Sequence, residues 1–214
     1  MELDKFRVES MPPSCYYIPE FITESEEKLL LHNIERTSVV RWTKLKNRRL
    51  INYGGIPTQK GMIAEDIPSY LQSYLDKVNS LKIFGDVEAN HILLNEYTAG
   101  QGIMPHFDGP LFYPTITTVS IGSHTILEFY QSQDMTRDVC FKVLVEPRSL
   151  LILKDELYSC YMHAISEVDE DDISDVLIKN KRSSEQEICK RGTRYSLTIR
   201  NVPKTTKFKL KLGK

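Results

Sequence analysis

The sequence predicts an α+β fold whose main body is a β-sandwich or jelly roll. Two amphipathic patterns in the first 85 residues predict helices. From about residue 86 onward, short runs rich in β-branched and aromatic residues alternate with Gly, Pro or charged residues, which is typical of strands and turns. The 214 residues are 41% hydrophobic and 27% charged, ordinary values for one globular domain.

The two predicted helices have recognisable starts. Thr23, with Glu26 three residues later, forms a capping-box pattern ahead of the run EEKLLLHNIE. A second helix is predicted over about 66–81, where Pro68 suits the first turn. Its apolar residues recur at i, i+3, i+4 and i+7. They are Ile67, Tyr70, Leu71, Tyr74, Leu75, Val78 and Leu81.

Six later runs predict strands. They are 91–97 (HILLNEY), 115–122 (TITTVSIG), 124–131 (HTILEFYQ), 139–146 (VCFKVLVE), 149–154 (SLLILK) and 193–202 (TRYSLTIRNV). Three other segments are expected to lie outside the core. These are a polar hairpin tip at 132–138, a solvated loop or disordered insertion at about 166–192, and a basic C-terminal edge strand or tail at 204–214, in which Phe208, Leu210 and Leu212 alternate with lysines.

Charge and cysteine usage narrow the class of protein. The formal net charge is −1, so any nucleic-acid-binding surface must be a local basic patch. The four cysteines form no CxxC pair, and neither an apolar leader nor a run long enough to span a membrane is present. We therefore expect a reducing intracellular location, in the nucleus and cytoplasm, and no membrane partner.

Residues 104–110 (MPHFDGP) place His106 and Asp108 at i and i+2, on one side of an extended chain. The pair suits a metal, a proton relay or a local hydrogen bond. Two histidines and a carboxylate on one face of an Fe(II) ion leave positions open for a co-substrate and O₂. A third ligand would come from a later strand, with His163 and His124 as the alternatives.

The run RYSLTIR (194–200) favours an anionic co-substrate. Strand alternation places Arg194, Ser196, Thr198 and Arg200 on one face. Buried arginines require anionic partners, and these two are separated by roughly 20 Å of strand. A short dicarboxylate reached by one arginine from each end satisfies both. In LLNEY, Asn95 and Tyr97 again share a face, which suits either hydrogen bonds to the same acid or a strand end with satisfied polar groups.

The order NxY, HxD, a distant His and RxSxTxR resembles the AlkB family of Fe(II)- and 2-oxoglutarate-dependent dioxygenases, over about residues 86–203. The wording GxxMPHFDGPLFYPTITTVSIGSHTILEFY is similar to that of the sixth AlkB homologue subgroup of animals and plants. The segments YYIPEFITESEE and NYGGIPTQKGM resemble that subgroup too. The resemblance implies a double-stranded β-helix (jelly-roll) core with N-terminal helices packed on it.

The resemblance also implies roles for the residues named above. His106, Asp108 and His163 match the iron ligands, and no catalytic side chain is expected beyond the metal centre. Positions matching the 2-oxoglutarate site are Asn95, Tyr97, Arg194, Ser196, Thr198 and Arg200. In this assignment Arg194 holds the distal carboxylate and Arg200 lies near the iron-chelating end. Many family members have Asn where this chain has Ser196, so the further polar contacts of that Asn are lost. The implied cofactors are Fe(II), 2-oxoglutarate and O₂, with ascorbate helpful to turnover.

The domain organisation follows from the same resemblance. Residues 1–85 would carry the N-terminal helices and a basic substrate lid, and 86–203 the dioxygenase core, all within one compact domain that we expect to be monomeric. The lid segment 41–60 holds six Lys or Arg residues and no acidic residue. Basic and aromatic residues together suit phosphate binding and base stacking. The expected substrate contacts are Trp42, Lys44, Lys46, Arg48, Arg49 and Tyr53.

The substrate itself remains open at this stage. The resemblance implies oxidation, with demethylation as the outcome, of an alkylated base in DNA or RNA. One alternative is a protein hydroxylase or demethylase with the same cofactor site, whose basic loop binds an acidic peptide. The other is a binding module that holds iron and 2-oxoglutarate but turns over poorly.

Overall fold

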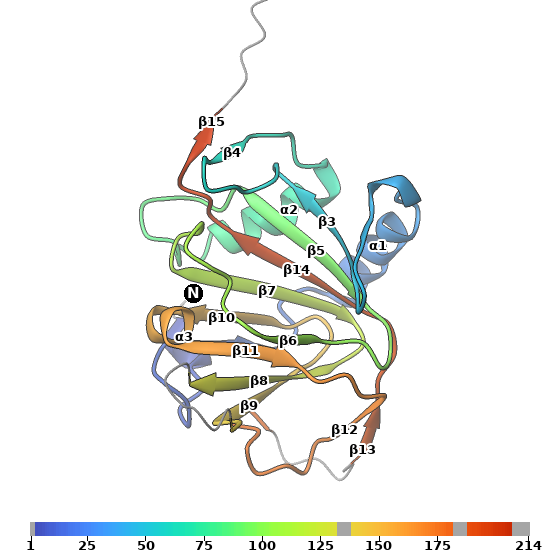
Figure 1. Ribbon diagram of the computed structural model, residues 1–214, viewed down its shortest axis with the longest axis vertical. Coiled ribbons are helices and arrows are strands. Elements are labelled where there is room, and N and C mark those ends of the chain that lie inside the picture. Colours follow the sequence, from blue (N-terminus) through green and yellow to red (C-terminus); the bar gives the residue numbers. More distant parts are fainter. Residues whose placement is uncertain (1–2, 132–137, 182–187, 207–214) are drawn as a thin grey trace, which may run out of the picture.

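Two antiparallel β-sheets face each other in the computed structural model, which describes residues 3–131, 138–181 and 188–206 (Figure 1). The larger sheet has seven strands in the order β1-β10-β7-β14-β5-β3-β2. The smaller sheet has four, in the order β6-β11-β8-β9. The arrangement confirms the predicted α+β jelly roll.

The strands of the larger sheet are β1 (Cys15–Ile18), β10 (Leu150–Lys154), β7 (Thr115–Gly122), β14 (Arg194–Arg200), β5 (His91–Tyr97), β3 (Arg49–Tyr53) and β2 (Thr43–Lys44). The smaller sheet contains β6 (Ile103–His106), β11 (Tyr161–Ile165), β8 (Thr125–Gln131) and β9 (Phe141–Val145). Two short pairs lie apart from both sheets, β12 (Glu170–Asp172) with β13 (Ile188–Lys190), and β4 (Met62–Ile63) with β15 (Thr205–Thr206). The helices are η1 (Leu3–Phe6), α1 (Glu24–Glu35), η2 (Val39–Arg41), α2 (Ser69–Asn79) and α3 (Asp155–Ser159).

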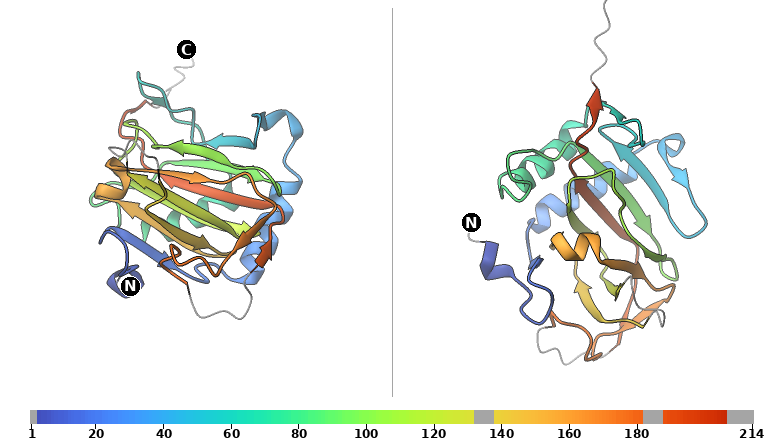
Figure 2. Two further views of the ribbon diagram at one scale, coloured as in Figure 1. Left: turned by 60° about the horizontal axis from the view of Figure 1, so that its bottom comes forward. Right: turned by 60° about the vertical axis from the view of Figure 1, so that its left-hand side comes forward.

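Helices α1 and α2 cover the face of the larger sheet that is turned away from the smaller sheet (Figures 1 and 2). Thr23 caps α1 through the predicted capping box, in which its side chain accepts from Glu26 N and Glu26 accepts from Thr23 N. The buried stripe of α2 consists of Leu71, Tyr74, Leu75 and Val78, as its spacing predicts. No helix among the described residues is long and apolar enough to cross a membrane.

The basic segment 41–60 is not a free loop. Residues 43–53 form a hairpin, and its strand β3 pairs with β5 over five residues. Ile51 and Tyr53 point into the helix-covered core, at 3% and 2% exposure, so the alternation Leu-Ile-Asn-Tyr explains why this stretch joins the sheet. The hairpin is therefore part of the scaffold, and only its tip is available to a substrate.

The expectation of a solvated loop at 166–192 is wrong for the part that the structure describes. Strands β12 and β13 pair there, and Ile173 and Ile178 are buried against Ile126. Asp171, from the acidic block, forms a buried two-bond ion pair with Arg191, at 2.7 and 2.6 Å. The acidic run did not predict this structure because Asp171 points inward and pairs with Arg191, a partner 20 residues later in the chain.

Two other expectations fall largely outside the described residues. The polar hairpin tip predicted at 132–138 overlaps the undescribed stretch 132–137, and the alternating Phe208, Leu210 and Leu212 lie beyond residue 206. The described end of the chain, β15, pairs in parallel with β4.

His91 is expected to make the fold sensitive to acid. It is fully buried, with Nε2 3.0 Å from Asn52 Oδ1, and burial first, then the charge of Arg200, lowers its pKa from 6.5 to about 3. The unfolded chain therefore binds a proton below about pH 6.5 that the folded protein refuses. The free energy of unfolding should fall by roughly 2–3 kcal/mol between pH 7 and pH 4 through this group.

Urea unfolding of the protein and of His91→Gln at pH 7, 5.5 and 4.5 measures this contribution. Gln keeps an N–H donor for Asn52 but does not titrate, so the variant should lose stability less steeply with falling pH. Parallel pH profiles for the two proteins would contradict the assignment.

Candidate metal and dicarboxylate site between the two sheets

A cavity of about 200 Å³ opens between the two sheets. The smaller sheet supplies His106 and His163, and the loop after β6 supplies Asp108. The larger sheet supplies arginines and other polar groups. From the larger sheet and its hairpin come Arg48, Asn95, Tyr97, Arg194, Ser196, Thr198 and Arg200. The structure thus places the predicted metal and co-substrate residues around one cavity.

Backbone pairing brings the two histidines together. His106 ends β6 and is the direct cross-strand partner of His163 in β11, with ring centroids 4.5 Å apart. Asp108 follows two residues after His106, and its Oδ2 lies 3.6 Å from His163 Nε2. The three side chains converge from two adjacent strands of the smaller sheet, β6 and β11, and from the loop after β6.

Hydrogen bonding and burial leave both imidazoles able to bind a metal. His106 Nδ1 lies 2.9 Å from the carbonyl oxygen of Met104, so Nδ1 carries the proton and Nε2 has the free lone pair. Burial lowers the pKa of His163 to about 4, against the opposing effect of Asp108, so its imidazole is neutral at physiological pH.

The donor set fits a first-row divalent metal, although the three side chains are not yet at the mutual distances of bound ligands. Two neutral imidazoles and one carboxylate form the three-ligand set that suits Fe(II). Asp108 Oδ1 accepts a hydrogen bond from Arg200 Nη1 at 2.8 Å, while Oδ2 faces His163. Among the described residues, no three His, Cys, Asp or Glu side chains are arranged closely enough to hold a metal ion. The chain therefore assembles the ligands on one side of the cavity and uses Arg200 to hold the carboxylate.

The other end of the cavity is built by cross-strand pairs of β14 and β5. Arg194 lies opposite Tyr97, and Ser196 opposite Asn95. Arg194 Nη2 donates to Ser120 Oγ at 2.8 Å, but its Nε and Nη1 are buried and lack a hydrogen-bond partner among the described residues. A guanidinium that is 5% exposed and incompletely paired is costly unless an anion binds to it. This end therefore fits a carboxylate.

Electrostatics support the same assignment. Burial lowers the pKa of Arg194 to about 10, a measure of how poorly its charge is compensated by the protein. Burial raises the pKa of the Tyr97 hydroxyl, and the charges of Arg48 and Arg194 oppose that rise. Tyr97 therefore remains a neutral O–H that is able to donate a hydrogen bond.

Arg200 departs from the simple expectation of a dicarboxylate held by two arginines. Its anionic partner is Asp108 of the protein itself, so a bound acid is needed to compensate Arg194 but not Arg200. Arg200 also stacks on Phe112 at 3.9 Å. Its position beside Asp108 is the metal end of the cavity, where the family resemblance puts it.

Several predicted substrate residues are engaged elsewhere. Tyr53 is buried in the core and hydrogen-bonded to Tyr70, so its assignment as a base-stacking residue is corrected. Arg49 forms a two-bond ion pair with Glu96 and stacks on Trp42 at 4.2 Å. The side chains of Arg49 and Trp42 therefore stabilise the hairpin. Lys44 and Lys46 are exposed, and Arg48 reaches the cavity.

His124, the alternative third ligand, is held away from His106. Its Nε2 lies 3.2 Å from Asp171 Oδ2, within the structured part of the 166–192 segment. Because Asp171 lies so far along the chain, local sequence could not assign this partner. Cross-strand pairing with His106 instead selects His163.

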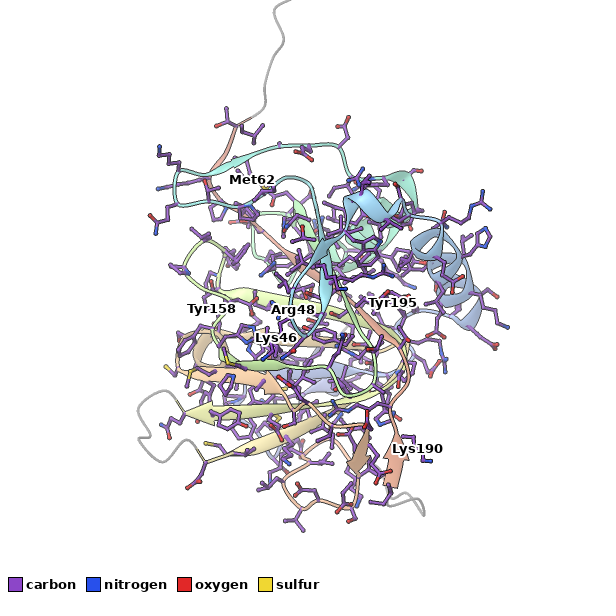
Figure 3. All side chains as sticks on the ribbon, turned by 45° about the vertical axis from the view of Figure 1, so that its right-hand side comes forward. Lys46, Arg48, Met62, Tyr158, Lys190 and Tyr195 are labelled. Atoms are coloured by element: carbon purple, nitrogen blue, oxygen red, sulfur yellow. The ribbon has the colours of Figure 1, made fainter. Side chains whose placement is uncertain are left out.

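Sequence reasoning missed three contributors. Ser120, which anchors Arg194, shares a face with Ile116 and Thr118 in β7, so strand alternation would have found it. Phe107, between His106 and Asp108 in the chain, also lines the cavity and is 38% exposed. Tyr158 donates hydrogen bonds to the carbonyls of Gly109 and Phe112 and so fixes the loop that follows Asp108 (Figure 3). No local pattern pointed to that role.

Comparison with known proteins agrees with the geometry. Residues 25–200 match the family described as the 2OG-Fe(II) oxygenase superfamily. The chain is 44% identical to the "Probable RNA/DNA demethylase ALKBH6" of Danio rerio, over all of this chain and 96% of that protein. It is 31% identical to an uncharacterised protein of Acanthamoeba polyphaga mimivirus, over 87% of this chain and 84% of the viral one.

A solved structure, OsALKBH1, shares the fold with a TM-score of 0.59 at 15% identity, covering 89% of this chain and 99% of that one. The family match extends over most of the cavity-forming strands and includes the ligand positions, Arg194 and Arg200. The chain therefore belongs to the 2OG-Fe(II) oxygenase superfamily, and within it to the AlkB type of oxygenase that resembles the sixth AlkB homologue.

Proposed function

We propose that the protein oxidises an N-alkyl group on an unpaired nucleic-acid base, with demethylation as the outcome. The observation that carries the proposal is the uncompensated positive charge of the cavity and its mouth. The zebrafish relative, named a probable RNA/DNA demethylase, supports the same substrate class.

In this proposal His106, Asp108 and His163 hold the metal, and Arg194, Asn95, Tyr97 and Ser196 bind the co-substrate. Bound Fe(II), with 2-oxoglutarate and O₂, supplies an oxidant that hydroxylates a C–H bond while succinate and CO₂ are released. A hydroxymethyl group formed on nitrogen then breaks down to the free amine and formaldehyde.

The protein's own task is to position groups and exclude water. Apolar side chains from both sheets wall the cavity, and they include Ile116, Leu127, Val145, Leu151 and Leu153. Such walls limit solvent access and so suppress side reactions of a strong oxidant. Arg200 holds Asp108 in place, and the carbonyl of Met104 sets the tautomer of His106.

Charge balance favours an anionic substrate. Three guanidinium groups, Arg48, Arg194 and Arg200, line the cavity with a single carboxylate, Asp108, which leaves two positive charges (3 − 1). A dicarboxylate neutralises those two. The charge of the divalent metal and the exposed Lys44 and Lys46 of the hairpin then remain to attract phosphates.

Phe107, at the mouth of the cavity, can take the base-stacking role that the buried Tyr53 cannot fill. Phe107 lines the cavity between two metal-ligand positions, and the neighbouring Met104 is 78% exposed. An exposed ring beside the metal can stack on a base that has been turned out of its strand. We assign this base-stacking role to Phe107.

Binding to single-stranded RNA or DNA should weaken steeply with salt. Lys44→Glu/Lys46→Glu should lower the slope of log K against log salt by about 1.4, since each single-strand phosphate contact contributes about 0.7. Fluorescence anisotropy with labelled oligonucleotides between 50 and 200 mM salt measures this. Lys28→Glu reverses one exposed charge on α1, away from the hairpin; it is the control and should keep the original slope.

Succinate release in the presence of methylated oligonucleotides and methylated acidic peptides separates the substrate classes. Release stimulated by oligonucleotides alone supports the proposal. Release stimulated by peptides alone, together with no oligonucleotide binding at low salt, would replace it with a protein hydroxylase or demethylase. Stimulation of turnover by ascorbate, a monomeric state, and a location in nucleus and cytoplasm stay predictions.

A further inference from the structure

Arg48 is a cation of the hairpin that reaches the same cavity as Arg194. It lines the cavity, and its Nε is buried without a hydrogen-bond partner among the residues that the structure describes. Its charge acts on the Tyr97 hydroxyl, which belongs to the co-substrate end of the cavity. Figure 3 shows Arg48 and Lys46 on the hairpin, over the region where the two sheets face each other.

Two nearby arginines have a carboxylate partner that Arg48 lacks. Arg49 has Glu96 and also stacks on Trp42, while Arg200 has Asp108, although Arg200 Nε is itself buried without a hydrogen-bond partner. Among the described residues that line the cavity, Arg48 and Arg194 have buried nitrogens without a hydrogen-bond partner and no carboxylate partner. Two such groups facing one space require an anion with more than one acceptor.

The hairpin is anchored through strand β3 and only lightly held at its tip, residues 45–48. Arg49, the first residue of β3 after the tip, is bonded to Glu96 of β5, while the tip is closed by the bond from Leu45 N to Arg48 O at 2.9 Å. The only side-chain hydrogen bond from the tip residues 45–48 to the rest of the described chain runs from Asn47 to the exposed Glu167. Exposed contacts of this kind contribute little to stability. A stronger bond from Arg48 into the cavity would therefore determine where the tip rests.

We propose that Arg48 is a further co-substrate-binding residue, which bonds a carboxylate of the bound dicarboxylate and so docks the hairpin over the cavity. The hairpin also carries Lys44 and Lys46, so co-substrate binding would place the cations that meet the nucleic acid. The inference rests on the dicarboxylate assignment of the cavity. Arg48, which the sequence predicted to contact the substrate, would instead connect the bound co-substrate to the hairpin.

The test measures binding rather than turnover. Calorimetric titration of 2-oxoglutarate into the Mn(II)-loaded protein should give about tenfold weaker affinity for Arg48→Gln, because one charge-assisted hydrogen bond is lost. Arg48→Lys should lie between the two. Lys60→Gln removes the same charge from an exposed side chain of the same 41–60 segment and should bind as the unaltered protein does.

Hydrogen exchange of residues 43–50 tests the docking. Adding 2-oxoglutarate should slow exchange there in the unaltered protein and in Lys60→Gln, but not in Arg48→Gln. The inference would be overturned if Arg48→Gln bound 2-oxoglutarate as tightly as the unaltered protein, or if 2-oxoglutarate did not change hydrogen exchange of the hairpin in the unaltered protein. Neither result would contradict the proposed function. Failure of the unaltered protein to bind 2-oxoglutarate would overturn the dicarboxylate assignment along with it.

Discussion

Asp108→Ala should abolish turnover and also lower the free energy of unfolding by about 3–5 kcal/mol. The loss of turnover follows because Asp108 is the proposed carboxylate ligand of the metal. The loss of stability follows because Arg200, 6% exposed, is left as an uncompensated buried charge. Succinate release reports the first effect, and urea unfolding of the metal-free protein reports the second.

A double variant separates the two roles of Asp108. Asp108→Ala/Arg200→Met removes the orphaned charge, so stability should largely return while turnover stays absent. Glu24→Ala, which breaks the exposed pair with Lys28, is the control and should leave stability unchanged within error. An Asp108→Ala variant as stable as the original protein would refute the structural role of the Arg200–Asp108 pair.

Arg194→Met should change stability and binding in opposite directions. Without ligand, the variant should be more stable by about 1–2 kcal/mol, because a buried and incompletely paired guanidinium is replaced by an apolar chain of similar length. Its affinity for 2-oxoglutarate should fall about 100-fold, because the carboxylate loses its charged partner. The structure thus predicts that binding capacity at this position is maintained at a cost in stability.

Thermal unfolding with and without 2-oxoglutarate measures both effects of Arg194→Met. The variant should melt above the original protein without ligand. A 2-oxoglutarate concentration that just saturates the original protein should raise its midpoint and raise that of the variant much less. Lys190→Met also replaces a cationic side chain with an apolar one, at an exposed residue of β13, and should leave the ligand-induced shift intact. An unchanged 2-oxoglutarate affinity in Arg194→Met would refute the role assigned to Arg194.

Local patterns predicted the elements that carry their information in neighbouring residues. The bounds of β5 and β7 agree with the predicted runs, and the capping box of α1 is present. Strand alternation correctly separated the two faces of β14, with Leu197 and Ile199 toward the helices and Arg194 and Ser196 lining the cavity. These features depend on periods of 2 and 3.6 residues, which are properties of the chain itself.

Strands without a strong apolar run were not predicted. β3 lies in a segment dominated by basic residues, and β6 and β11 are short and half-buried. Each of them is stabilised by pairing with a distant strand rather than by its own composition. Strand formation of this kind depends on tertiary context more than on residue propensity.

The sequence by itself determined the chemistry that the protein can perform. Strand spacing placed His106 with Asp108, Asn95 with Tyr97, and Arg194 with Arg200 on shared faces, and the resemblance to the AlkB family assigned their roles. The tertiary structure decided which distant groups become partners. It paired Arg200 with Asp108 across 92 positions, chose His163 over His124, buried Tyr53, and turned Arg48 and Phe107 to the cavity. A charge or ring can be read from one residue, but its partner depends on which strands the fold brings together.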